Sequence, residues 1–138
     1  MFKTQVLQSF AGFDEFLGYL CIAAGLLILF VALYVRITPY REIALIREGN
    51  RAAAYSLSGT LLGMAIPLAS AIEHSVNPVD MVIWGAIALA VQLLVFVLAR
   101  MALPNVATDI PAGKEASGLF LGVVSLAGGI LSAACMTY

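Results

Sequence analysis

SGTLLGMAIPLAS (residues 58–70) and LGVVSLAGGILSA (residues 121–133) each lie inside a long apolar segment. Glycine, serine and proline interrupt both stretches, although glycine and proline are the weakest helix formers. In lipid, leucine gains little by leaving an acyl chain for another helix, whereas small residues let two backbones approach closely. The two stretches therefore predict a pair of tightly packed membrane helices.

The composition agrees with a lipid environment. Of 138 residues, 62% are hydrophobic and 11% are charged, whereas a soluble domain is about 45–50% apolar and about 25% charged. The net charge of −1 provides no broad basic surface for nucleic acid. One histidine and two cysteines predict neither a metal centre nor another cofactor. We expect a single membrane domain over residues 1–138 that contacts the lipid bilayer.

Four apolar segments are long enough to cross a bilayer, which takes about 20 residues. Because they are continuous rather than alternating, they predict helices. The fold class expected is all-α, an integral membrane four-helix bundle. The spans lie at about 17–36, 52–72, 81–103 and 116–137.

The basic residues predict an orientation, because Lys and Arg concentrate in cytoplasmic loops. Lys3 alone lies with the amino terminus, and the others flank the first and third connections: Arg36, Arg41, Arg47, Arg51, Arg100 and Lys114. We therefore expect both basic connections in the cytoplasm, and both termini and the middle connection on the periplasmic or exterior side. Aromatic residues would mark the interfaces: Tyr19 and Trp84 outside, and Tyr34, Tyr40 and Tyr55 inside.

The first connection predicts a short interfacial helix, with Thr38 as its cap, Pro39 at its first position and Gly49 at its end. Its polar side would carry Arg41, Glu42, Arg47 and Glu48. Asn50 would cap the second span. The first dozen residues are also amphipathic and predict an outer interfacial helix.

The halves of the chain resemble each other at an offset near 63–65 residues. Each half has a leucine-rich span, a basic residue, a proline, a basic turn and a glycine-rich span. This order predicts two tandem two-helix repeats in parallel orientation, at about 15–73 and 80–138.

Small residues on the second and fourth spans predict that these two helices form the central pair, with the bulkier first and third spans facing lipid. The candidate packing residues are Gly59, Gly63, Gly118, Gly122, Ser125 and Gly129.

Pro67 raises a second possibility, because proline removes the hydrogen bond to the Gly63 carbonyl. Softened helices at matching depth in two halves point to a midplane site. Its candidate residues are Ser58, Thr60, Pro67, Ser70, Gln92, Gly128 and Ser132. The alternative is a kink whose hydroxyls bond to their own helix, with Gln92 making an interhelical hydrogen bond.

Four segments resemble the YjfL-like family of small bacterial inner-membrane proteins: ITP (37–39), SGTLLGMAIPL (58–68), WGAIALAVQLLVF (84–96) and LAGGILSAACMTY (126–138). The resemblance covers residues 15–138 and implies a four-span protein of two tandem units. It supplies no activity. The genes often found near family members, for amino-acid or polyamine ligases and envelope-stress proteins, give a contextual hint of envelope maintenance.

The candidate chemistry disfavours an enzyme. His74 beside Glu73 is expected to be a solvated pair, and Cys135 has no nearby base. The predicted spans contain no carboxylate, which argues against a proton-coupled exporter. We expect Cys21 and Cys135 to be separate buried thiols.

Two functions remain open at this point. One is a noncatalytic membrane module that forms homo-oligomers or binds a membrane-protein partner. The other is a pore or facilitator for a small ion or solute, lined by the second and fourth spans of several subunits.

Overall fold

The computed structural model describes residues 1–38 and 40–136, and all the secondary-structure elements within these residues are helices. Four of the helices are long and apolar enough to cross a membrane, which confirms the predicted all-α membrane fold. In chain order the elements are α1 (Phe2–Phe10), α2 (Phe13–Ile37), α3 (Glu42–Arg47), α4 (Arg51–His74), α5 (Pro78–Ala102), α6 (Val106–Asp109) and α7 (Glu115–Cys135).

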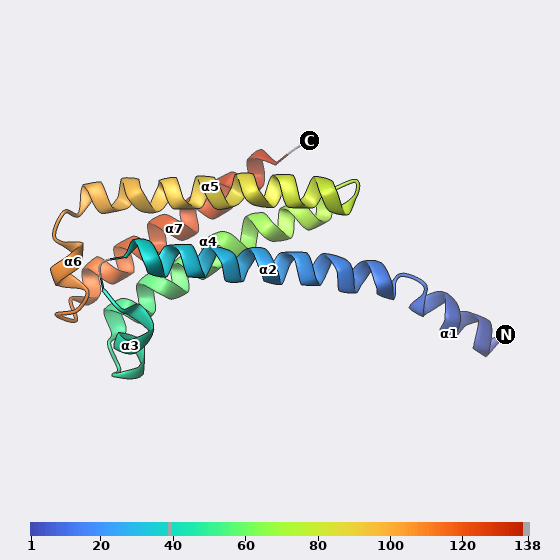
Figure 1. Ribbon diagram of the computed structural model, residues 1–138, viewed down its shortest axis with the longest axis horizontal. Helices are drawn as coiled ribbons and strands as arrows, with labels where there is room; N and C mark the ends of the chain where they lie inside the picture. The colour runs from blue at the N-terminus through green and yellow to red at the C-terminus, as the bar shows by residue number, and fades with distance from the viewer. Residues whose placement is uncertain (39, 137–138) are drawn as a thin grey trace.

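The central pair of the bundle is α4 and α7, which cross each other and make the most extensive helix contact of the described residues, while α2 packs on both α4 and α5 (Figure 1). The short helices α3 and α6 lie together at one end. The α4–α5 turn lies toward the opposite end, beyond which α1 extends away from the bundle. Neither the side of the membrane nor the repeat relationship follows from this arrangement, so both stay predictions.

Side-chain caps fix where two of the long helices begin. Asn50 Oδ1 accepts a hydrogen bond from the Ala53 backbone N–H at 3.0 Å, as predicted, and Asn50 Nδ2 donates to the Ile110 carbonyl at 2.9 Å. Asn77 Oδ1 accepts from the Asp80 N–H at 2.9 Å, ahead of a proline at the first helical position. Asn50 thereby ties the two helix-bearing connections to each other.

The first connection differs from the prediction. Helix α3 begins at Glu42, not directly after Thr38, and the expected start at Pro39 lies outside the described residues. Thr38 instead ends α2 in an extended conformation, which a following proline favours, and its hydroxyl donates to the Val35 carbonyl at 3.0 Å. Gly49 ends the α3 segment with a positive φ of 89°.

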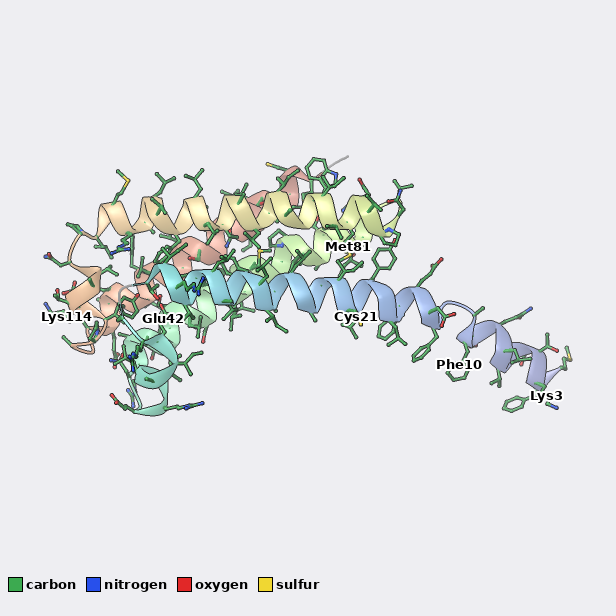
Figure 2. All side chains as sticks on the ribbon, viewed as in Figure 1. Lys3, Phe10, Cys21, Glu42, Met81 and Lys114 are labelled. Atoms are coloured by element: carbon green, nitrogen blue, oxygen red, sulfur yellow. The ribbon has the colours of Figure 1, made fainter. Side chains whose placement is uncertain are left out.

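Three expectations about side-chain location were wrong. Tyr34 and Tyr40 were expected at the membrane interface and Glu42 on a polar, solvated face, but all three side chains are buried. Because the extended conformation of Thr38 changes the direction of the chain at the end of α2, α3 packs against α4. This packing buries Glu42 between α3 and the bundle. Figure 2 shows Glu42 at the end where α2 stops and α3 begins.

The cysteines are both free thiols, as predicted, but they are exposed on the helices rather than buried. Cys21 lies on the edge of α2 that faces away from α5 (Figure 2). The expectation of burial failed for Cys21 because α2 contributes few residues to the interior: only Phe30 and Tyr34 of this helix are buried. Cys135 is the last residue of α7, where it lines an open groove.

Candidate functional site

The seam between α4 and α7 is built from backbone contacts at glycine. A Cβ added to Gly59 would overlap the backbone of Gly122, and one added to Gly118 would overlap the backbone of Ala52. Gly129 meets Gly63 in the same way. The structure thus brings together the residues that the small-residue pattern selected, and Ser125 is buried between them.

Pro67 is buried within α4, and the carbonyl that it deprives of a partner is that of Gly63. The Gly63 carbonyl oxygen lies against Gly129, where an added Cβ would overlap it. A Cα–H···O contact is a weak substitute for the missing hydrogen bond. Ser70 does not join this group, because its hydroxyl donates to the Ala133 carbonyl at 3.1 Å, one turn further along α7.

A buried group of polar side chains lies beside the glycine seam. The Thr60 hydroxyl lies 2.7 Å from the Ser56 carbonyl and 3.3 Å from Ser125 Oγ. Gln92 Nε2 donates to the Ser125 carbonyl at 3.0 Å, which is the interhelical hydrogen bond considered for this residue. Gln92 Oε1 is buried and has no hydrogen-bond partner in the described part of the chain.

Of the remaining midplane candidates, only Gly128 lies against this group, because a Cβ added to it would come within 3.3 Å of Gln92 Oε1. Ser58 is exposed, because it lies two positions from both Ser56 and Thr60 and so points to the other side of α4. Gly128 and Ser132 line an open, largely apolar groove between α5 and α7. Of the seven candidates, Thr60 and Gln92 alone are joined through a shared partner, Ser125.

Sequence reasoning missed a cluster at the end of the bundle that carries α3. The Glu42 side chain is fully buried, and Tyr40 is nearly so. Tyr34 Oη lies 3.0 Å from Ser56 Oγ, and both side chains are buried. In the described residues, both carboxylate oxygens of Glu42 and the Tyr40 hydroxyl lack a hydrogen-bond partner.

The electrostatics of the cluster follow from its burial. Burial raises the pKa of the Glu42 carboxyl from 4.5 to about 7, although the nearby Tyr34 and Tyr40 hydroxyls act in the opposite direction. Burial, with Glu42 adding to it, also raises the pKa of the Tyr40 phenol. The cluster therefore holds a carboxyl that titrates near neutral pH.

A weak signal for this cluster is present in the sequence. Phe30 and Tyr34 are four residues apart and end the apolar face of α2, where a tyrosine needs a polar partner if it is buried. The partner hydroxyl of Ser56 is 22 residues further along the chain. The helical pattern of the connection gave no means of choosing which of its charged residues would face inward.

Comparisons with known proteins concern nearly the whole chain. Residues 6–136 match the model of a domain of unknown function, DUF350. The chain is 45% identical over 133 residues to the UPF0719 inner membrane protein YjfL of Escherichia coli K12, covering 96% of this chain and 98% of that protein. It is 25% identical over 114 residues to the UPF0719 transmembrane protein YshE of Bacillus subtilis, covering 81% and 85%. No solved structure matches it.

Proposed function

The chain belongs to the DUF350 family, and from that premise we propose that it is a noncatalytic inner-membrane module that associates with further copies of itself through the outward face of α2. The observation that carries the proposal is the surroundings of two glycines in α2. Cβ atoms added to Gly18 and Gly25 would meet nothing within 4 Å outside their immediate chain surroundings.

This openness is informative because glycine has a cost in a helix interior, about 0.5–1 kcal/mol relative to alanine. The glycines of the α4–α7 seam have a use within the chain, since any larger residue would overlap a neighbouring backbone. Gly18 and Gly25 have no such use among the residues that the structure describes. Close approach of a second helix is a use that small residues serve in membranes.

The spacing on α2 suits a helix partner. Gly18, Gly25 and Ala32 are exposed and follow each other at intervals of seven, the repeat that keeps one face of a helix along a left-handed crossing. Cys21 and Ile28 are exposed between them. A second copy packed along this face would place Cys21 of each chain near the crossing.

The burial of the spans favours the same face. In the most apolar window of the first span, 6% of the residues are buried, compared with 44% for α4. The first span is thus the element that a single chain covers least. A pore between α4 and α7 of one chain is disfavoured, because backbone contacts at Gly59, Gly63 and Gly118 close that seam.

Cysteine cross-linking in native membranes tests the proposal. With Cys135 replaced by serine, mild oxidation should yield a disulfide-linked dimer through Cys21, and Gly25→Leu should abolish the dimer by holding the helices apart. The matched control is Leu94→Cys in a chain without other cysteines, because Leu94 is a highly exposed position near the middle of α5. A dimer through Leu94→Cys of equal yield, or none through Cys21, would refute the α2 interface.

A further inference from the structure

The Glu42 carboxyl has surroundings that suit its neutral form. Its side chain is fully buried and neither oxygen accepts a hydrogen bond from the described residues. The ion pairs that the described residues make, Arg51–Glu115 and Lys114–Asp109, do not include it. A buried carboxylate without a paired cation is costly, and such groups commonly take up a proton instead.

The groups that face the carboxyl come from each element packed around it. Tyr34 comes from α2 and Tyr40 from the connection, and both are neutral phenols in the physiological range. Against the larger effect of burial, the positive charge of Arg100 on α5 lowers the pKa of the Tyr40 phenol. Helix α4 contributes the hydroxyls of Ser56 and Thr60, which do not titrate. Burial therefore dominates, and it raises the pKa of the carboxyl to about 7.

The segment that carries Glu42 is a short helix with limited packing on the rest of the bundle. Helix α3 has six residues, and within the bundle it packs chiefly on α4. The helix ends at Arg47, and the turn after it contains Gly49, which has a positive φ of 89° and donates its N–H to the Ile46 carbonyl at 3.0 Å. A glycine at this position leaves the chain free to change direction there without a steric penalty. Moving α3 outward would hydrate the carboxylate while leaving the α4–α7 seam intact.

We propose that Glu42 is a reversible proton-binding site that holds α3 against the end of the bundle in its protonated form. Loss of the proton breaks the carboxyl O–H bond and gives the proton to water. The resulting carboxylate is stabilised by hydration once α3 swings out about Gly49. The ligand of the site is the proton, and the response is the release of α3. This inference does not depend on association through α2.

Buried polar groups continue inward from the site. Tyr34 Oη pairs with Ser56 Oγ at 3.0 Å, Thr60 lies between the Ser56 carbonyl and Ser125 Oγ, and Gln92 donates to the Ser125 carbonyl. Release of α3 would therefore expose one end of this row of polar side chains, which extends to the middle of α5. The protonation state of Glu42 thus controls whether water can reach the row.

Infrared difference spectroscopy of the full-length protein in lipid nanodiscs tests the site. We expect a carbonyl stretch of a protonated carboxylic acid that disappears with a midpoint near pH 7. The band should be absent in Glu42→Gln and unchanged in Glu48→Gln, an exposed glutamate of the same connection. If Glu42→Gln does not fold, Glu42→Asp should keep an acid band but shift its frequency and midpoint.

A second measurement follows the movement of α3. In a chain without the native cysteines, the rate of maleimide labelling at Leu45→Cys, relative to the exposed Ile43→Cys, should rise several-fold between pH 5.5 and 8.5. Leu45 packs against the buried cluster at this end of the bundle. The proposal would be overturned by an acid band that titrates near the ordinary pKa of glutamate, or by a relative labelling rate that is independent of pH. A midpoint that moves with sodium concentration would also overturn it, because the ligand would then be a sodium ion and not the proton alone.

Discussion

The glycines of the α4–α7 seam and those of α2 have opposite surroundings. Gly59, Gly63 and Gly129 stand against the backbone of the facing helix, whereas Gly18 and Gly25 face open space. Both sets weaken a helix by similar amounts. In the seam, glycine is required by packing within the chain. On α2 the packing of the chain does not require glycine, which suggests a contact with another molecule.

The largest effect is expected at the seam. Gly122→Leu and Gly59→Leu should each cost at least about 3 kcal/mol, because a branched side chain would have to enter a contact between backbones. Gly18→Leu and Gly25→Leu should leave the single chain at least as stable as the wild type, with a gain of up to about 1 kcal/mol from removing a helical glycine. Folded yield and melting temperature in detergent measure the difference. Equal losses for both sets would remove the distinction between the two regions.

The next largest effect is a pH dependence of stability, which we expect at the end of the bundle that carries α3 and not at the seam. Glu42 has a folded-state pKa of about 7, raised from 4.5, so the folded protein binds more protons than the unfolded chain between these values. The contribution of Glu42 to stability is therefore most favourable below pH 4.5 and becomes less favourable as the pH rises to about 7, by up to about 3 kcal/mol.

Glu42→Gln should remove this pH dependence, because an amide stays neutral, and should melt above the wild type at pH 8. Glu48→Gln serves as the control, since Glu48 is exposed. Melting curves from pH 4 to pH 9 check both variants. A wild-type protein whose stability rises over this interval would contradict the sign of the effect.

A smaller effect is expected for the polar group beside the seam. Gln92→Met should cost only about 0.6 kcal/mol and at most about 1.7 kcal/mol, the range for interhelical hydrogen bonds in membranes. The substitution removes the bond to the Ser125 carbonyl but also removes the buried, unpartnered Oε1. Leu94→Met on the exposed side of α5 is the control for thermal stability. A loss comparable to that of Gly122→Leu would mean that the amide, not the glycine contact, holds the centre together.

The sequence was sufficient for the fold because membrane spans leave a strong signal. Apolar length predicted the four long helices, the small residues selected Gly59 and Gly122, and Asn50 was correctly predicted as the cap of α4. These features depend on composition and local spacing. Lipid also simplifies the problem, because close packing of membrane helices is concentrated at small residues.

The cluster at Glu42 could not be predicted in the same way. Its position depends on how Thr38 turns the chain after α2 and on a contact between Tyr34 and Ser56, which are 22 residues apart. Helical periodicity placed Glu42 with Arg41 and Arg47 on a solvated side. A six-residue helix is too short for periodicity to decide which of its sides is buried.

The central claim is that the open glycines of α2 mark a contact between copies of this chain. Förster transfer between donor- and acceptor-labelled copies in liposomes measures it directly, at decreasing protein-to-lipid ratios. The account predicts transfer above the random-encounter level for the wild type and for Gln92→Met, and its loss in Gly18→Leu/Gly25→Leu, with the fold of each variant intact. Transfer at the wild-type level in the double glycine variant would contradict the claim.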